Sequence, residues 1–73
     1  MDARLGRACH EARINAGLRL LDVAEHARVS EATLSRFEAG DGWRRETNRI
    51  VCAYAEATGL TARELWKRAL DTE

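Results

Sequence analysis

The stretch LLDVAEHARVSEATLSRFEAG, residues 20–40, has the pattern of two short helices joined by a tight turn. Ala24 is small where the first of these helices must let the second cross closely, and Val29 places an apolar side chain in the turn. Ser30 follows directly, and a serine hydroxyl accepts a hydrogen bond from the unpaired backbone N–H groups that begin a helix. This spacing lets two helices pack at roughly 90–120°, so the stretch predicts a helix-turn-helix over about 20–39.

The rest of the chain also favours helix over strand. It contains no proline and thirteen alanines, and no window alternates apolar and polar residues as a half-buried strand does. Gly17 and Gly59 mark helix ends, and Thr61 with Glu64 has the pattern of an N-terminal capping box. We therefore expect an all-α, compact five-helix bundle forming a single domain. It covers residues 1–73, with helices at about 2–15, 20–27, 31–39, 47–58 and 62–70.

Apolar side chains recur at helical spacing and predict one small core. The residues expected to face it are Leu5, Ala8, Cys9, Ala12, Leu21, Val23, Ala24, Ala27, Leu34, Phe37, Ile50, Val51, Tyr54 and Ala55. Cys9 and Cys52 form no CxxC unit, so we interpret both as reduced, small core residues. Gly6 lies inside the first helix, where a glycine costs about 1 kcal/mol relative to alanine.

Size and composition exclude several classes of function. A chain of 73 residues buries only about 60% of the surface that its unfolded form exposes, which leaves little stability for a deep catalytic cavity. No nucleophile–base pair and no paired carboxylates stand at catalytic spacing, so we expect no enzyme. His10, His26 and the two cysteines lack any recognised ligand spacing, so we expect no metal and no cofactor. The sequence has no apolar run of membrane-spanning length and no signal peptide, which favours a cytoplasmic protein.

The segment from residue 5 to residue 70 resembles the lambda-repressor and Cro family of helix-turn-helix DNA-binding domains, also called the Xre type. The matching residues are Gly17-Leu18, Val23-Ala24, Val29-Ser30, Thr33-Leu34-Ser35-Arg36-Phe37-Glu38, Gly40, Gly59-Leu60-Thr61 and Glu64-Leu65. The resemblance implies a bundle of five helices and a sequence-specific transcription regulator, such as a bacterial or phage repressor. It also implies a partly buried salt bridge between Arg13 and Glu38 that fixes the second helix of the motif against the first helix of the chain.

The resemblance implies that the helix expected at 31–39 enters the major groove of double-stranded DNA. The side chains expected to turn outward and read base edges are Glu31, Ala32, Thr33, Ser35 and Arg36. Arg36 can donate two parallel hydrogen bonds to guanine, Ala32 suits the thymine methyl group, and Glu31 can accept from a cytosine amino group. For Glu31 an equal alternative is a purely structural role, since an acid in the first turn favours a helix.

Phosphate contacts are expected from residues that flank this helix. They are Arg19, Ser30, Arg44, Arg45 and Arg49. In the family that this chain resembles, a Ser or Thr followed by Gln usually stands where this chain has Arg19 and Leu20. The Gln amide usually contacts the DNA backbone, so here the charge of Arg19 would take its place. For Arg44 and Arg45 the alternative is a solvated charged face without a ligand.

Leu60, Trp66 and Leu70 form a candidate apolar patch around the last helix. A homodimer through this patch would bind a palindromic operator with half-sites about one helical turn apart. The alternative for Trp66 is that it only caps the small core.

A second class of function stays open at this point. The chain has 12 basic and 12 acidic side chains, whereas nucleic-acid binders usually carry a basic excess. DNA binding therefore requires that charge is segregated by face. Neutrality and the missing Gln favour a helix-turn-helix used as a protein-interaction module, such as an adaptor, an antitoxin or an anti-repressor partner. Nothing in the sequence indicates a small-molecule ligand.

Overall fold

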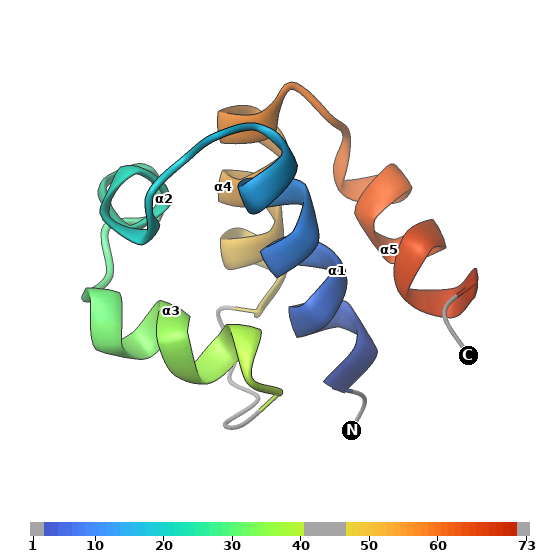
Figure 1. Ribbon diagram of the computed structural model, residues 1–73, viewed down its shortest axis with the longest axis horizontal. Helices are drawn as coiled ribbons and strands as arrows, with labels where there is room; N and C mark the ends of the chain where they lie inside the picture. Colours follow the sequence, from blue (N-terminus) through green and yellow to red (C-terminus); the bar gives the residue numbers. More distant parts are fainter. Residues whose placement is uncertain (1–2, 41–46, 72–73) are drawn as a thin grey trace.

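The computed structural model describes residues 3–40 and 47–71, and it folds them into five α-helices (Figure 1). The helices are α1 (Ala3–Asn15), α2 (Leu20–Ala27), α3 (Glu31–Glu38), α4 (Thr47–Thr58) and α5 (Ala62–Asp71). The predicted all-α class is confirmed, and the predicted helix bounds agree with the observed ones to within one residue. No helix in the described ranges is both long and apolar enough to cross a lipid bilayer.

Helices α1 and α4 form the centre of the bundle. α1 packs against α3, α4 and α5, and α4 packs against α1, α2 and α5. The pair α2–α3 therefore lies on one side of the molecule and α5 on the other (Figure 1). This arrangement leaves the outer sides of α2 and α3 uncovered by the other helices.

The core is a single apolar cluster to which all five helices contribute. Its fully buried side chains are Leu5, Cys9, Val23, Leu34, Val51, Tyr54 and Leu65. Two predictions were wrong: Leu21 is 39% exposed, and Cys52 is exposed. In α2, Leu20 is the leucine that packs against the core, because the inward stripe of Val23, Ala24 and Ala27 leaves Leu21 to one side.

Two backbone positions decide how α2 and α3 are held. Arg28 ends α2 in the left-handed conformation, with φ of 58°, and the N–H of Val29 donates to the carbonyl of Ala24 at 3.1 Å. A non-glycine residue pays a steric penalty there, yet the turn into α3 requires this geometry. Gly6 lies where α1 crosses the end of α3, so closely that a Cβ would overlap with the carbonyl oxygen of Phe37.

Candidate DNA-binding surface

The start of α3 is fixed by a side-chain cap. The hydroxyl oxygen of Ser30 accepts a hydrogen bond from the backbone N–H of Thr33 at 3.1 Å, and the two hydroxyl oxygens lie 3.0 Å apart. The cap sets where the helix begins and which side chains of its first turn face outward. Ser30 itself stays exposed at this end of α3.

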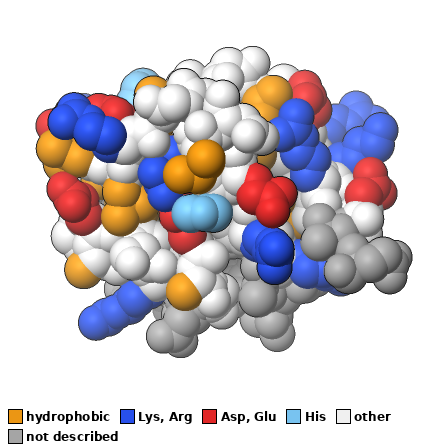
Figure 2. Space-filling view, viewed as in Figure 1, with side chains coloured by type: hydrophobic (Ala, Val, Ile, Leu, Met, Phe, Trp, Pro, Cys, Tyr) orange, Lys and Arg blue, Asp and Glu red, His pale blue; other side chains and the backbone are white. Residues whose placement is uncertain are grey.

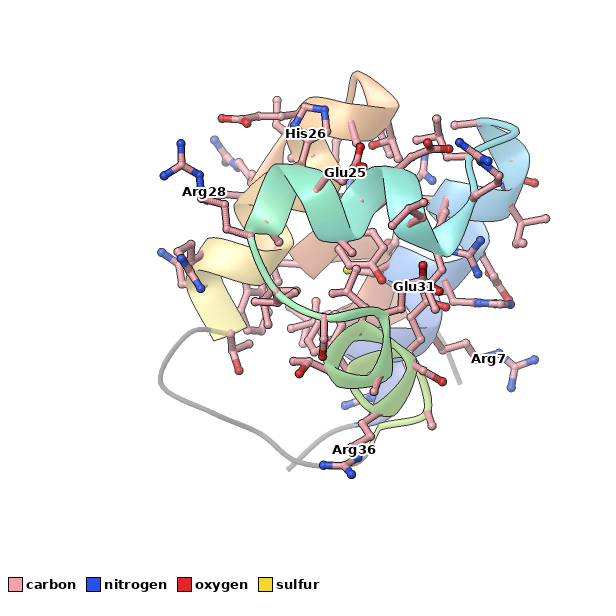
Figure 3. The ribbon with its side chains drawn as sticks, turned by 90° about the vertical axis from the view of Figure 1, so that its left-hand side faces the viewer. Arg7, Glu25, His26, Arg28, Glu31 and Arg36 are labelled. Atoms are coloured by element: carbon pink, nitrogen blue, oxygen red, sulfur yellow. The ribbon has the colours of Figure 1, made fainter. Side chains whose placement is uncertain are left out.

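α3 has one buried side and one exposed side. Leu34 and Phe37 point into the core, where the Phe37 ring lies 5.8 Å from the ring of Tyr54. The exposed residues of the helix are Glu31, Ala32, Ser35 and Arg36. Figure 3 views α3 end-on and shows Arg36 extending away from the bundle. Thr33 is half-buried, so its side chain stands at the margin of this surface.

The C-terminal end of α3 is held by a cluster of polar side chains around Glu38, whose side chain is only 8% exposed. Arg13 on α1 donates from Nε to Oε2 at 2.8 Å and from Nη2 to Oε1 at 3.1 Å, and its Nη1 donates to the carbonyl of Leu18 at 3.0 Å. The hydroxyl of Tyr54 on α4 donates to Oε2, and Nδ1 of His10 lies 2.7 Å from Oε1. α3 is thus tied to both central helices through one carboxylate.

These contacts determine the protonation states in the cluster. Burial raises the pKa of Glu38, but the hydrogen bonds from Arg13, Tyr54 and His10 outweigh it and leave that pKa below its ordinary value. Burial, followed by the hydrogen bond to Glu38, raises the pKa of the Tyr54 hydroxyl. Burial and the Glu38 charge raise the pKa of the Cys9 thiol to about 12. The cluster therefore contains an ionised Glu38 beside the Arg13 guanidinium and the Tyr54 hydroxyl, whose pKa values are both raised.

The predicted phosphate-contacting residues occupy different settings. Arg19 lies directly before α2 with a 76% exposed side chain, and its Nη2 lies 3.1 Å from Oδ1 of Asp22. Arg49 is exposed in the first turn of α4. Arg44 and Arg45 lie outside the described residues. On the face seen in Figure 2, acidic and basic side chains of the described residues alternate, without a continuous basic patch.

The predicted dimer residues are not equivalent. Trp66 and Leu70 are 38% and 67% exposed on α5, whereas Leu60 is half-buried and packs against the core.

The described part of the chain contains no group of three or more His, Cys, Asp or Glu side chains that could hold a metal ion.

Sequence reasoning missed two members of the Glu38 cluster. His10 precedes Arg13 by three residues and so shares its side of α1, which is a usable signal. Tyr54 was predicted as a core residue, and it is one, but a buried tyrosine hydroxyl also requires a hydrogen-bond partner. The need for such a partner was therefore a signal in the sequence that a polar side chain lies next to the Tyr54 hydroxyl.

Comparison with models of protein families matched residues 4–66 to a family described as "Helix-turn-helix domain". The matched segment includes the α2–α3 pair, nearly all of α1, all of α4 and the first half of α5. No curated protein and no solved structure gave a match. The family match agrees with the resemblance to the lambda-repressor and Cro domains and covers most of the chain. The chain belongs to a helix-turn-helix domain family, which places it among the DNA-binding regulators in general.

Proposed function

We propose that the protein is a sequence-specific transcriptional regulator, of the repressor type found in bacteria and phages, that acts on nucleoid DNA. In this proposal α3 lies in the major groove of an operator. The observation that carries the proposal is the two-sided character of α3. One side is fixed to α1 and α4 through Glu38, and the other presents exposed side chains on the outside of the bundle.

The exposed side chains of α3 have chemistry suited to base edges. Arg36 is long, exposed and able to donate two hydrogen bonds to one guanine. Ala32 and Glu31 are assigned to a thymine methyl and a cytosine amino group, and Ser35 contacts either kind of base edge. Thr33 is assigned to the edge of the base-reading surface, because it is half-buried and its hydroxyl lies close to that of Ser30.

Ser30, Arg19 and Arg49 supply the proposed phosphate contacts among the described residues, with Arg44 and Arg45 as further candidates. Such contacts position a protein on the duplex without reading its sequence. All three described residues are exposed, and Ser30 stands at the N-terminal end of α3, where backbone N–H groups favour a phosphate.

We also propose that two copies bind a palindromic operator, with Trp66 and Leu70 of α5 in the contact between them. Support comes from two large apolar side chains that are exposed one helical turn apart. Leu60 contributes less, because it is already packed on the core.

The second candidate is a protein-interaction module with little affinity for DNA. Two observations favour it: the formal net charge is zero, and the guanidinium of Arg19 is already paired with Asp22. A neutral surface gives a weak electrostatic attraction to phosphates.

Selection of bound duplexes from a random DNA pool, followed by titration at several salt concentrations, separates the two candidates. The regulator yields an enriched palindrome, and its log K falls against log salt with a slope of about −0.9 for each phosphate neutralised. The interaction module yields no enriched sequence and a flat salt profile on every duplex.

A further inference from the structure

Arg19 and Asp22 form a closed pair at the start of α2. Oδ1 of Asp22 lies 3.1 Å from Nη2 of Arg19, and Oδ2 accepts the backbone N–H of Arg19 at 2.8 Å. One carboxylate therefore caps the helix and holds the guanidinium. Hydrogen bonds from the side chain and then the backbone of Arg19 keep the pKa of Asp22 below its ordinary value.

Two further acidic side chains act on the Arg19 guanidinium. Glu25 on α2 and Glu31 at the start of α3 both act electrostatically on Arg19. Figure 3 labels both residues on the side of the molecule formed by α2 and α3. The hydrogen bond that Arg19 donates to Asp22 is the main reason that the pKa of the guanidinium is raised, and the charges of Asp22, Glu25 and Glu31 add to it. A phosphate that approaches Arg19 must displace one carboxylate and approach two more.

We propose that Asp22 is a specificity-determining residue, because it holds Arg19 back from random DNA and releases it only when operator binding fixes a phosphate beside it. This inference rests on the proposed function. Non-specific affinity comes almost entirely from cations that neutralise phosphates. In a non-specific complex no base contact fixes the register, so no phosphate is held in one position long enough to replace Asp22. In the operator complex the base contacts of α3 fix the register, and a phosphate can then compete.

Asp22→Asn tests the proposal with little change of shape. The amide oxygen of Asn still accepts the N–H of Arg19, so the cap of α2 is kept while the charge is lost. Glu64→Gln is the matched control. It removes the charge of a second exposed acid–arginine pair, in which Arg68 Nη2 lies 4.0 Å from Glu64, on α5 at the opposite side of the bundle from α2 (Figure 1). Both variants change the net charge equally.

The measurement is the equilibrium binding of the full chain to a duplex of random sequence and to the selected operator, each over a range of salt concentrations. Asp22→Asn is expected to raise affinity for random DNA about two- to fivefold more than Glu64→Gln does. This range corresponds to the strength of one exposed ion pair, which a phosphate no longer has to break to reach Arg19. The slope of log K against log salt on random DNA steepens by about 0.9. Affinity for the operator rises less, so the ratio of specific to random affinity falls.

A third comparison separates release of Arg19 from direct repulsion between Asp22 and DNA. In the Arg19→Ala background, the excess effect of Asp22→Asn over Glu64→Gln is expected to disappear. An excess that persists there, or equal behaviour of the two single variants in the parent background, overturns the inference and leaves the proposed function standing. Absence of DNA binding by the parent protein overturns both.

Discussion

Gly6 on α1 lies directly against the backbone of Phe37 on α3, and a Cβ at Gly6 would overlap with the Phe37 carbonyl oxygen. It would also lie 3.2 Å from the carbonyl oxygen of Glu38. The obstructing atoms are backbone, which cannot rotate aside as a side chain does. The closest crossing between α1 and α3 is therefore a contact that only glycine permits, next to the residue that ties α3 to the bundle.

Gly6→Ala is expected to destabilise the protein by about 1–3 kcal/mol, since extra volume at a tight contact forces the helices apart. The sign is opposite to that of an ordinary helix, where replacing glycine by alanine stabilises by about 1 kcal/mol. Urea unfolding monitored by circular dichroism gives the free energy. Asn15→Ala, at an exposed position of the same helix, is the control and is expected to be neutral or stabilising. An increase in stability for Gly6→Ala would show that the crossing is looser than described.

Tyr54→Phe removes one donor from Glu38 while keeping the ring in the core. The expected loss of stability is about 1.5–3 kcal/mol, the range for hydrogen bonds to charged groups. The same substitution in a Glu38→Gln background should cost less, because the charged acceptor has already gone. A double-mutant cycle of the four proteins measures this coupling. Additive costs for the two substitutions would argue against a direct contact between Tyr54 and Glu38.

Stability is expected to fall in acid because of Glu38. Its pKa is lower in the folded protein than the ordinary value of 4.5, so folding favours the ionised carboxylate. The stabilisation is fully present above the unfolded pKa and is lost as the pH falls through the folded pKa. Free energies of unfolding measured from pH 7 down to pH 3 should decline below about pH 5 in the parent, and less steeply in Glu38→Gln. Glu11→Gln, an exposed acid on α1, should follow the parent. Equal acid profiles for all three proteins would contradict this role of Glu38.

The two cysteines should differ in reactivity. Cys9 is fully buried with its pKa raised to about 12, so it stays a protonated thiol, whereas Cys52 is exposed. Because the thiolate is the reactive species, a disulfide reagent should modify one thiol in the native protein and two after unfolding. Cys52→Ser should abolish the native reaction. Rapid modification of both thiols without denaturant would contradict the burial of Cys9.

The features that could be predicted from the sequence are those that depend on interactions between residues a few positions apart. Ser30 caps α3 because a serine hydroxyl reaches the N–H three residues on, and Thr61 accepts from Glu64 at 3.0 Å in the same way at α5. The apolar spacing of Val29, Leu34 and Phe37 placed the inward side of the helix-turn-helix for the same reason.

What the sequence did not predict depends on contacts between distant segments. Leu21 is an exception, because Leu20 has helical spacing with Val23, Ala24 and Ala27 and the sequence alone could have placed Leu20 on the inward side. The need for Gly6 appears only when α1 and α3 are placed together. The link from Tyr54 to Glu38 likewise joins residues sixteen positions apart on two helices.

The central claim, that the exposed side of α3 reads DNA bases, is tested most directly by comparing Arg36→Ala with Arg49→Ala on the selected operator and on its single-base-pair variants. Arg36→Ala is expected to cost about 1–3 kcal/mol on the operator and to relax the preference at one base pair. Arg49→Ala is expected to weaken binding to all duplexes alike, with a salt slope shallower by about one. Full retention of operator affinity and of every base preference by Arg36→Ala would contradict the claim.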